Sequence, residues 1–142
     1  MNLEQEIKKF LGKHACERYE KTDTLKDIIQ KWHEPFGVEF CQKFNYPDIE
    51  LIRRYKNEFE QYGVYVDRKD LIIENQDVIL FNCIAELHYK RPEKRYSVIL
   101  YADNVVTLSA KEYAFVVCDE ISKKNSVMID TDDNAIVSIL ND

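Results

Sequence analysis

The side chains of this sequence that could perform nucleophilic or metal chemistry are a few histidines and cysteines in its first third. His14 and Cys16 are close together, but His33 and Cys41 follow singly, and the chain has no CxxC motif. A cysteine nucleophile needs a base within hydrogen-bond reach, and zinc usually takes its ligands from two close pairs. We therefore expect the cysteines to be buried apolar residues and the chain to hold no metal site.

The acidic segment Asp130–Asn134 is a second candidate for cation binding. Its carboxylates alternate as in a calcium-binding loop, but the chain lacks the glycine at the sixth position and the glutamate at the twelfth that such a loop requires. We expect an acidic turn before the last strand, with calcium binding as the alternative.

Motifs of common enzyme classes are absent from the sequence. The three glycines stand at positions 12, 37 and 63, which excludes a glycine-rich phosphate loop. A nucleophile elbow and an HExxH motif are also missing. We therefore expect no catalytic residue and no cofactor, and we expect that the protein is not an enzyme.

The segment His88–Tyr96 (HYKRPEKRY) carries four basic residues and two tyrosines around a proline. Basic and aromatic groups together can bind phosphate or stack on bases, and they also occur on solvated hairpin tips. We expect a projecting loop that contacts a partner through Tyr89, Arg91, Arg95 and Tyr96. A solvated loop without a partner is the alternative.

The elements that would position these side chains begin with helices. Apolar residues recur at helical spacing over residues 3–11 and 25–32. A short helix is expected over Val38–Phe44, and another over Asp48–Tyr55 with Pro47 at its first turn. The first 61 residues are therefore expected to be helical.

Short β-prone runs replace the helical pattern after Gly63. Taking Val78, Val98, Phe115 and Ile136 as equivalent, the runs recur at steps of 20, 17 and 21 residues. Such self-similarity indicates stacked repeats, because one repeat cannot bury its apolar side until the next lies on it. The four similar runs are Asp77–Asn82, Ser97–Ala102, Ala114–Asp119 and Ala135–Leu140.

A second set of apolar runs lies between the first, which gives two short strands for each repeat. Asn82, Asp103 and Asn104 are expected at the corners, because Asp and Asn tolerate a left-handed backbone. We predict an α+β fold: an N-terminal helical cap over residues 1–61 and a short β-solenoid or β-roll of about four rungs over residues 62–142, packed as one unit. A small antiparallel β-sandwich with N-terminal helices is the alternative, since its strands also recur every ~8–12 residues.

The charge distribution restricts the partners. The net charge is −6, and residues 62–142 hold 14 acidic and 9 basic side chains. This charge opposes binding of nucleic acid by the β part. The N-terminal residues are charged throughout, and no apolar stretch approaches the ~20 residues that span a bilayer. We expect no contact with a membrane and a cytoplasmic location.

Three segments, Thr24–Ile29, His33–Cys41 and Tyr62–Asp67, resemble those of an uncharacterised group of proteins from gut Bacteroidetes and their phages or prophages. The resemblance covers much of residues 24–67 and, more loosely, the β half. It implies a helical start followed by a β-repeat body, and it brings no activity to carry over.

Within the segment His33–Cys41, we expect a structural role. Gly37 would permit a tight turn there. Phe36, Val38 and Phe40 would cover one end of the β stack, because a solenoid needs caps for its open edges.

We expect a non-enzymatic structural or protein–protein interaction module, which self-associates or docks on another protein and could be phage- or prophage-encoded. An open stack end leaves unpaired backbone groups, which favour an edge-to-edge partner. An inhibitor of a host factor is one alternative. A nucleic-acid-binding protein is another, with two helices around Pro47 acting as a helix-turn-helix.

Exchange of Arg91 and Arg95 for glutamate is expected to weaken partner binding, because it reverses two charges of the basic segment. The melting temperature should not change, since loop tips contribute little to the core. Binding assays and thermal denaturation of the double variant test this, and an unchanged affinity would count against the loop.

Overall fold

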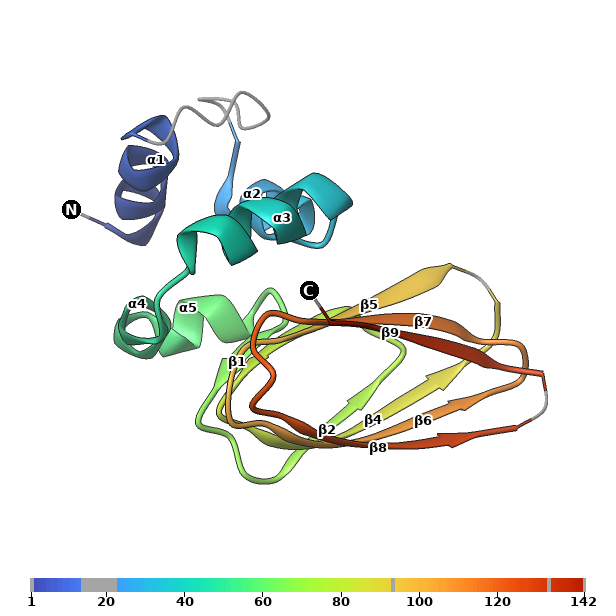
Figure 1. Ribbon diagram of the computed structural model, residues 1–142. Coiled ribbons are helices and arrows are strands. Elements are labelled where there is room, and N and C mark those ends of the chain that lie inside the picture. The colour runs from blue at the N-terminus through green and yellow to red at the C-terminus, as the bar shows by residue number, and fades with distance from the viewer. Residues whose placement is uncertain (1, 14–22, 93, 133, 142) are drawn as a thin grey trace.

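The computed structural model describes residues 2–13, 23–92, 94–132 and 134–141, with helices first and strands after them (Figure 1). The helices are α1 (Leu3–Lys13), α2 (Leu25–Trp32), α3 (Pro35–Phe44), α4 (Ile49–Arg54) and α5 (Lys56–Glu60). The strands are β1 (Val64–Val66), β2 (Leu71–Glu74), β3 (Val78–Phe81), β4 (Ile84–Lys90), β5 (Arg95–Leu100), β6 (Val105–Lys111), β7 (Phe115–Glu120), β8 (Ser126–Thr131) and β9 (Ile136–Asn141). The α+β class is therefore confirmed.

The strands alternate along the chain between two sheets. One sheet has the order β1-β3-β5-β7-β9, and the other has the order β2-β4-β6-β8. We call them the odd sheet and the even sheet. Every strand pair between described residues is parallel, which contradicts the antiparallel pairing of the sandwich alternative.

The register of the odd sheet is more regular than the sequence suggested. Val78 pairs with Val98, Val98 with Cys118, and Cys118 with Ile139, which gives steps of 20, 20 and 21 residues. The equivalence of Val98 with Phe115, and with it the step of 17, is wrong. Both residues are apolar, but they lie an odd number of positions out of register and so face opposite sides of the sheet.

The corners between strands use Asn and Asp in two ways. Asn82 and Asp103 have positive φ angles of 53° and 62°, which confirms the expected left-handed corners. Asn104 is instead buried, and its side chain bridges neighbouring repeats. Its Oδ1 accepts from the Cys83 backbone N–H at 2.8 Å, and its Nδ2 donates to the Leu80 carbonyl at 3.1 Å. The side chain thus satisfies backbone groups that the corner leaves unpaired.

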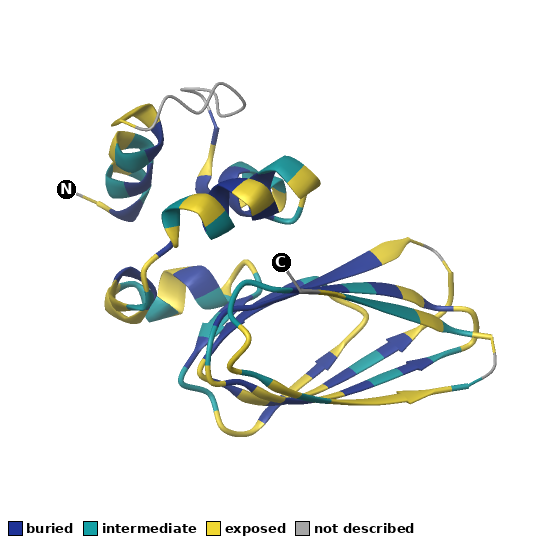
Figure 2. Ribbon diagram, viewed as in Figure 1, coloured by how far each residue is buried: buried dark blue, intermediate teal, exposed yellow. Residues whose placement is uncertain are grey.

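The space between the two sheets is a continuous apolar core. The strands β2, β4 and β6 of the even sheet alternate buried and more exposed residues, whereas β3 and β5 are buried on both faces (Figure 2). Parallel strands covered on both faces are typically continuous apolar runs, which explains why these two segments stood out in the sequence. The inward-facing residues include Leu80, Leu87, Val98, Leu100, Leu108 and Val116.

The helices cover the outer face of the odd sheet. Trp32, Ile52 and Phe59 belong to one apolar cluster with the outward-facing Ile79 and Ile99. The expected cover of a stack end by the His33–Cys41 segment is therefore wrong. That segment lies over the face of the sheet, because the outward residues of β3 and β5 are themselves apolar and need cover.

The helix boundaries follow local capping chemistry. The Thr24 side chain caps α2, and Asp27 completes the capping box. Pro35 is the first residue of α3, where its missing N–H costs no hydrogen bond. Pro47 does not lie in the first turn of the next helix, as we expected. It precedes Asp48, whose carboxylate caps α4 instead.

Gly37 lies inside α3 and not in a tight turn, which corrects the expectation from the sequence. A Cβ at this position would lie 2.0 Å from the carbonyl oxygen of Lys31 and 2.8 Å from the Cα of Trp32. The glycine therefore permits the close approach of α2 and α3.

Replacement of Gly37 by alanine is expected to lower the free energy of unfolding by roughly 1–3 kcal/mol or more, because the added methyl group meets rigid backbone. Gly12→Ala is the matched control, since a Cβ on Gly12 of α1 has nothing within 4 Å. The control should be neutral or stabilising by up to about 1 kcal/mol, given the helix propensity of alanine. Urea denaturation of both variants tests this, and equal effects would contradict the close approach.

Candidate protein interface

The tyrosines of the predicted partner-binding segment do not lie on a projecting loop. Tyr89 and Tyr96 are buried in the core between the sheets, with ring centroids 4.9 Å apart. The Tyr89 hydroxyl donates to the Gln76 carbonyl at 2.8 Å. Their placement on the loop is wrong because β4 continues to Lys90 and β5 begins at Arg95, so strand alternation turns both rings inward.

The two arginines of the same set are exposed and lie in different elements. Arg91 lies in the connection between β4 and β5, with a φ of 75°. Arg95 is the first residue of β5 and lines a groove on the outer face of the odd sheet. The structure therefore does not bring the four predicted residues into one surface, and a partner-binding role of the arginines stays a prediction.

The candidate thiol and metal residues do not form a site among the described residues. Cys41, Cys83 and Cys118 are buried free thiols, and burial raises the pKa of Cys118 to about 12. No three His, Cys, Asp or Glu side chains come together as metal ligands in the described ranges. His14 and Cys16 lie outside the described residues.

The acidic segment connects β8 and β9. The Asp132 carboxylate accepts backbone N–H groups of Glu112 and Asn134, each at 3.0 Å, and these bonds lower its pKa. This agrees with the expected acidic turn. Of the other two carboxylates, Asp130 lies in β8 and accepts from Lys111 Nζ at 3.1 Å, and Asp133 is outside the described residues.

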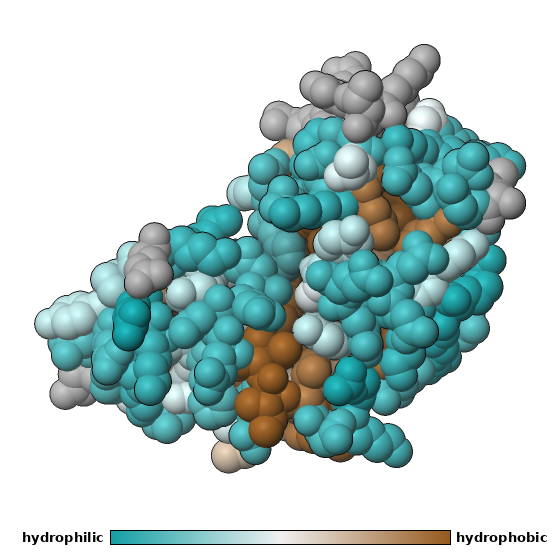
Figure 3. Space-filling model, turned by 180° about the vertical axis from the view of Figure 1, so that it is seen from behind, coloured by the Kyte–Doolittle hydropathy of each residue, from teal (hydrophilic) through white to brown (hydrophobic). Residues whose placement is uncertain are grey.

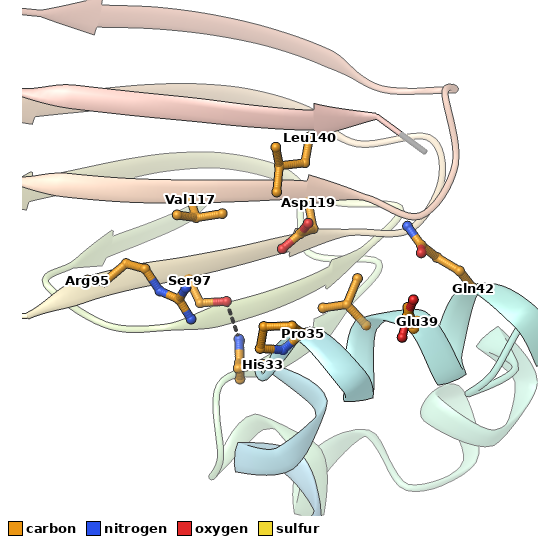
Figure 4. Close-up of a pocket in the computed structure, with 10 residues that line it drawn as sticks. His33, Pro35, Glu39, Gln42, Arg95, Ser97, Val117, Asp119 and Leu140 are labelled. Carbon is orange, nitrogen blue, oxygen red and sulfur yellow. Dashed lines mark hydrogen bonds between the residues drawn. The ribbon is translucent and has the colours of Figure 1, made fainter.

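A groove of about 330 Å³ lies where α3 meets the strands β5, β7 and β9 (Figure 4). Its floor carries the buried polar residues Ser97 and Asp119, and Val117 and Leu140 add apolar surface. Glu39 and Gln42 line it from α3, and in Figure 4 they lie at the opposite end from the Arg95 side chain. The helices thus leave part of the outer face of the odd sheet accessible.

His33 lines the same groove and joins the helices to β5. Its Nδ1 lies 2.7 Å from the Ser97 hydroxyl oxygen, within hydrogen-bond distance. Burial lowers the pKa of His33 to about 4; the Asp77 carboxylate opposes this shift, and Lys94 and Arg95 add to it. Among the described residues Nε2 has no hydrogen-bond partner that would orient the ring as in a catalytic triad. The pair is therefore a polar contact between α2 and β5.

The last two strands, β8 and β9, leave apolar side chains uncovered; we call them the terminal strands. Val137 and Ile139 continue the inward-facing rows of Val116 and Cys118, yet they are only partly buried. In β8, Ile129 continues the row of the fully buried Leu108 but is 42% exposed. Figure 2 shows the same contrast, with the terminal strands in yellow and teal. The core between the sheets is therefore open at this end.

The strands β1 and β2 at the opposite end of the stack have more of their side chains buried. Val64 and Val66 of β1 are buried under the helices, and Leu71 and Ile73 of β2 are buried between the sheets. Tyr65 packs against the same core. Seen from behind, the molecule is mostly hydrophilic, with hydrophobic side chains in a central band and in a second area at the upper right (Figure 3). The two ends therefore differ in how far their inward-facing side chains are covered.

The edge strand β9 lacks the features that usually prevent strand pairing. Residues 135–141 (AIVSILN) contain no charged residue and no proline. Exposed edge strands commonly carry lysine or proline, because a bare edge is a template for another strand. Outward-facing Ile136 is 62% exposed. The sequence analysis expected an edge-to-edge partner at an open stack end but did not single out this strand, although its uncharged pattern was visible in the sequence.

Comparisons with known proteins found no match, whether with family models, with curated proteins or with solved structures. Among the described residues, none of the helices has the length and apolar character needed to cross a membrane.

The His33 environment predicts a pH-dependent stability. The folded pKa of about 4 lies below the usual 6.5, so the unfolded chain binds the proton more readily between these values. Stability should therefore fall as the pH falls, by about 2–3 kcal/mol between pH 7 and 4.5 from this group alone. The variant His33→Gln can keep the contact to Ser97 but has no imidazole to protonate. Its free energy of unfolding should therefore fall less between pH 7 and 4.5. Urea denaturation at both pH values tests this, and identical pH dependence in both proteins would contradict it.

Proposed function

We propose that this chain is a non-enzymatic protein–protein interaction module, built as a short β-solenoid with a helical lobe on one face. Its docking surface comprises the terminal strands β8 and β9. A protein that adds a strand to β9 would cover the open end of the core.

The solenoid description is supported by the path of the chain. Consecutive strands alternate between the two sheets, and all their pairings are parallel. In the even sheet, Ala85 pairs with Val106 and Val106 with Val127, which are steps of 21 residues. A constant step with alternation between two sheets is expected of a coil of stacked repeats.

The observation that carries the proposal is the incomplete burial of inward-facing apolar residues on the terminal strands, where Ile129 is 42% exposed. Val137, Ile139 and Ile129 occupy core positions of the repeat, and no further strand among the described residues covers them. Burial of apolar surface contributes about 25 cal/mol per Å², so a partner that covers this end gains both area and backbone hydrogen bonds.

Nucleic-acid binding by the helical lobe receives less support. The Arg53 guanidinium is paired with Asp67 and Glu50 at 2.8 and 3.0 Å, and Arg54 is paired with Glu6 at 3.2 Å. These neighbouring carboxylates offset the positive charge that phosphate contacts would need. Inhibition of a host factor would use the same terminal strands and is therefore a variant of the proposal.

Ile136→Lys tests the docking surface, because a lysine on an edge strand opposes strand addition. An affinity-tagged chain is used to capture an untagged second copy and proteins from a lysate of the source cells. The unmodified chain should retain at least one protein. The variant should bind that protein more weakly by about tenfold or more, a change in affinity that corresponds to ~1.4 kcal/mol.

Ile84→Lys is the matched control, since Ile84 is also exposed but lies on β4, inside the even sheet. Substitution of either exposed residue should change stability by about 0.5 kcal/mol or less. Retention of the same proteins by both variants would contradict docking at the terminal strands.

A further inference from the structure

We infer that the strand which pairs with β9 is β9 of a second copy of this chain, antiparallel, with a two-fold axis at Ser138. The inference rests on the proposed docking at the terminal strands and names the partner. The result would be a closed dimer in which two odd sheets join into one.

The first support is the pattern of β9 itself. The segment Ile136-Val137-Ser138-Ile139-Leu140 has the same order of residue classes in both directions. Antiparallel pairing centred on Ser138 sets Val137 opposite Ile139 of the second copy, and both face the core. It sets Ile136 opposite the second copy's Leu140, and both face outward. Apolar residues thus meet apolar residues on each face of the joined sheet.

The backbone direction supports the same register. The Ile136 N–H donates to the Ala114 carbonyl at 2.9 Å, so this residue directs its backbone groups toward β7. Since backbone groups alternate along a strand, Val137 and Ile139 direct theirs toward the open edge. With the axis at Ser138, Val137 lies opposite Ile139 of the second copy, and Ile139 lies opposite Val137 of the second copy. Both are hydrogen-bonded pairs. A shift by one residue would instead oppose inward-facing to outward-facing side chains.

At the contact strand itself, charge does not oppose a second copy. The chain carries a net charge of −6, so two copies repel each other at long range. The contact strand itself has no charged side chain that would oppose its own image. The repulsion is therefore spread over distant, screened groups, and no like charges are buried in the contact.

Head-to-tail stacking, which would produce a filament, fits less well. It would require β9 to pair with β1, which has only three residues against six in β9. The side chains of Val64 and Val66 are already buried under the helices. Contact between two identical open ends gives closed two-fold symmetry instead.

The helices do not obstruct this arrangement. α3 approaches β9 at its carboxyl end, where Leu140 lines the groove, and the amino end of β9 points away from the helices (Figure 1). Antiparallel pairing places the carboxyl end of one β9 beside the amino end of the other. The two helical lobes therefore lie at opposite ends of the joined sheet.

Cross-linking through Ser138→Cys tests the axis. Ser138 would face the second copy's Ser138 as a non-hydrogen-bonded pair, in which Cβ atoms lie ~4.5–5.5 Å apart, close enough for a disulfide after small shifts. Ile136→Cys is the matched control on the same strand. Residue 136 of one copy would lie opposite residue 140 of the other, four residues from the second copy's residue 136. The two thiols at position 136 would therefore lie roughly 14 Å apart at ~3.4 Å per residue.

Both variants and the unmodified chain, which gives the background from native cysteines, are oxidised mildly and analysed without reductant. Sedimentation velocity of the reduced proteins is measured over a range of concentrations. We expect a concentration-dependent dimer for all three proteins, and cross-linking of Ser138→Cys at least about tenfold faster than that of Ile136→Cys.

A dimer in which Ser138→Cys links no faster than Ile136→Cys would overturn the two-fold pairing, while docking at the terminal strands would stand. A chain that is monomeric at every concentration would overturn the second copy as partner. The proposed function itself would be overturned only if the Ile136→Lys variant retained all captured proteins. Failure of the dimer and failure of the proposed function are therefore distinguishable.

Discussion

The structure depends on one constraint: a repeat in a parallel stack buries its inward side chains only when the next repeat lies on it. Leu108 and Cys118 are fully buried because β8 and β9 follow them. The helices cover the outer face of the odd sheet at β1, and no described strand follows β8 and β9 in the two sheets. The exposure of Ile129 and Ile139 is thus a direct consequence of how this fold is built.

The helical lobe buries the apolar side chains on the outer face of the odd sheet, which no other described element covers. Ile79 and Ile99 face outward and are buried only because helices lie on them. From Ser97 of β5 toward β9 this cover is less complete, and the outward positions are mixed, with Ser97 and Asp119 on the groove floor. The His33–Ser97 contact marks that border. A lobe that covers only part of one face leaves the edge of the sheet at β9 free for a partner.

Much of the fold could be predicted from the sequence, because strand periodicity and corner residues such as Asn82 are local signals. The register at Phe115 could not, since apolar character alone does not say which face a residue takes. Tyr89 and Tyr96 were misplaced because the charged residues around them obscured the alternation of the two strands. The interface candidate depends on which strand comes last in the stack, and this is a property of the assembled sheets.

Hydrogen exchange of the β9 amides at low and high protein concentration tests the central claim most directly. Val137 and Ile139 direct their N–H groups to the open edge, so these amides should exchange rapidly in dilute protein. The account predicts that they become protected as the concentration rises, while the amides of β6 in the middle of the even sheet stay protected throughout. Rapid exchange of both edge amides at every concentration would contradict pairing of the terminal strands between copies.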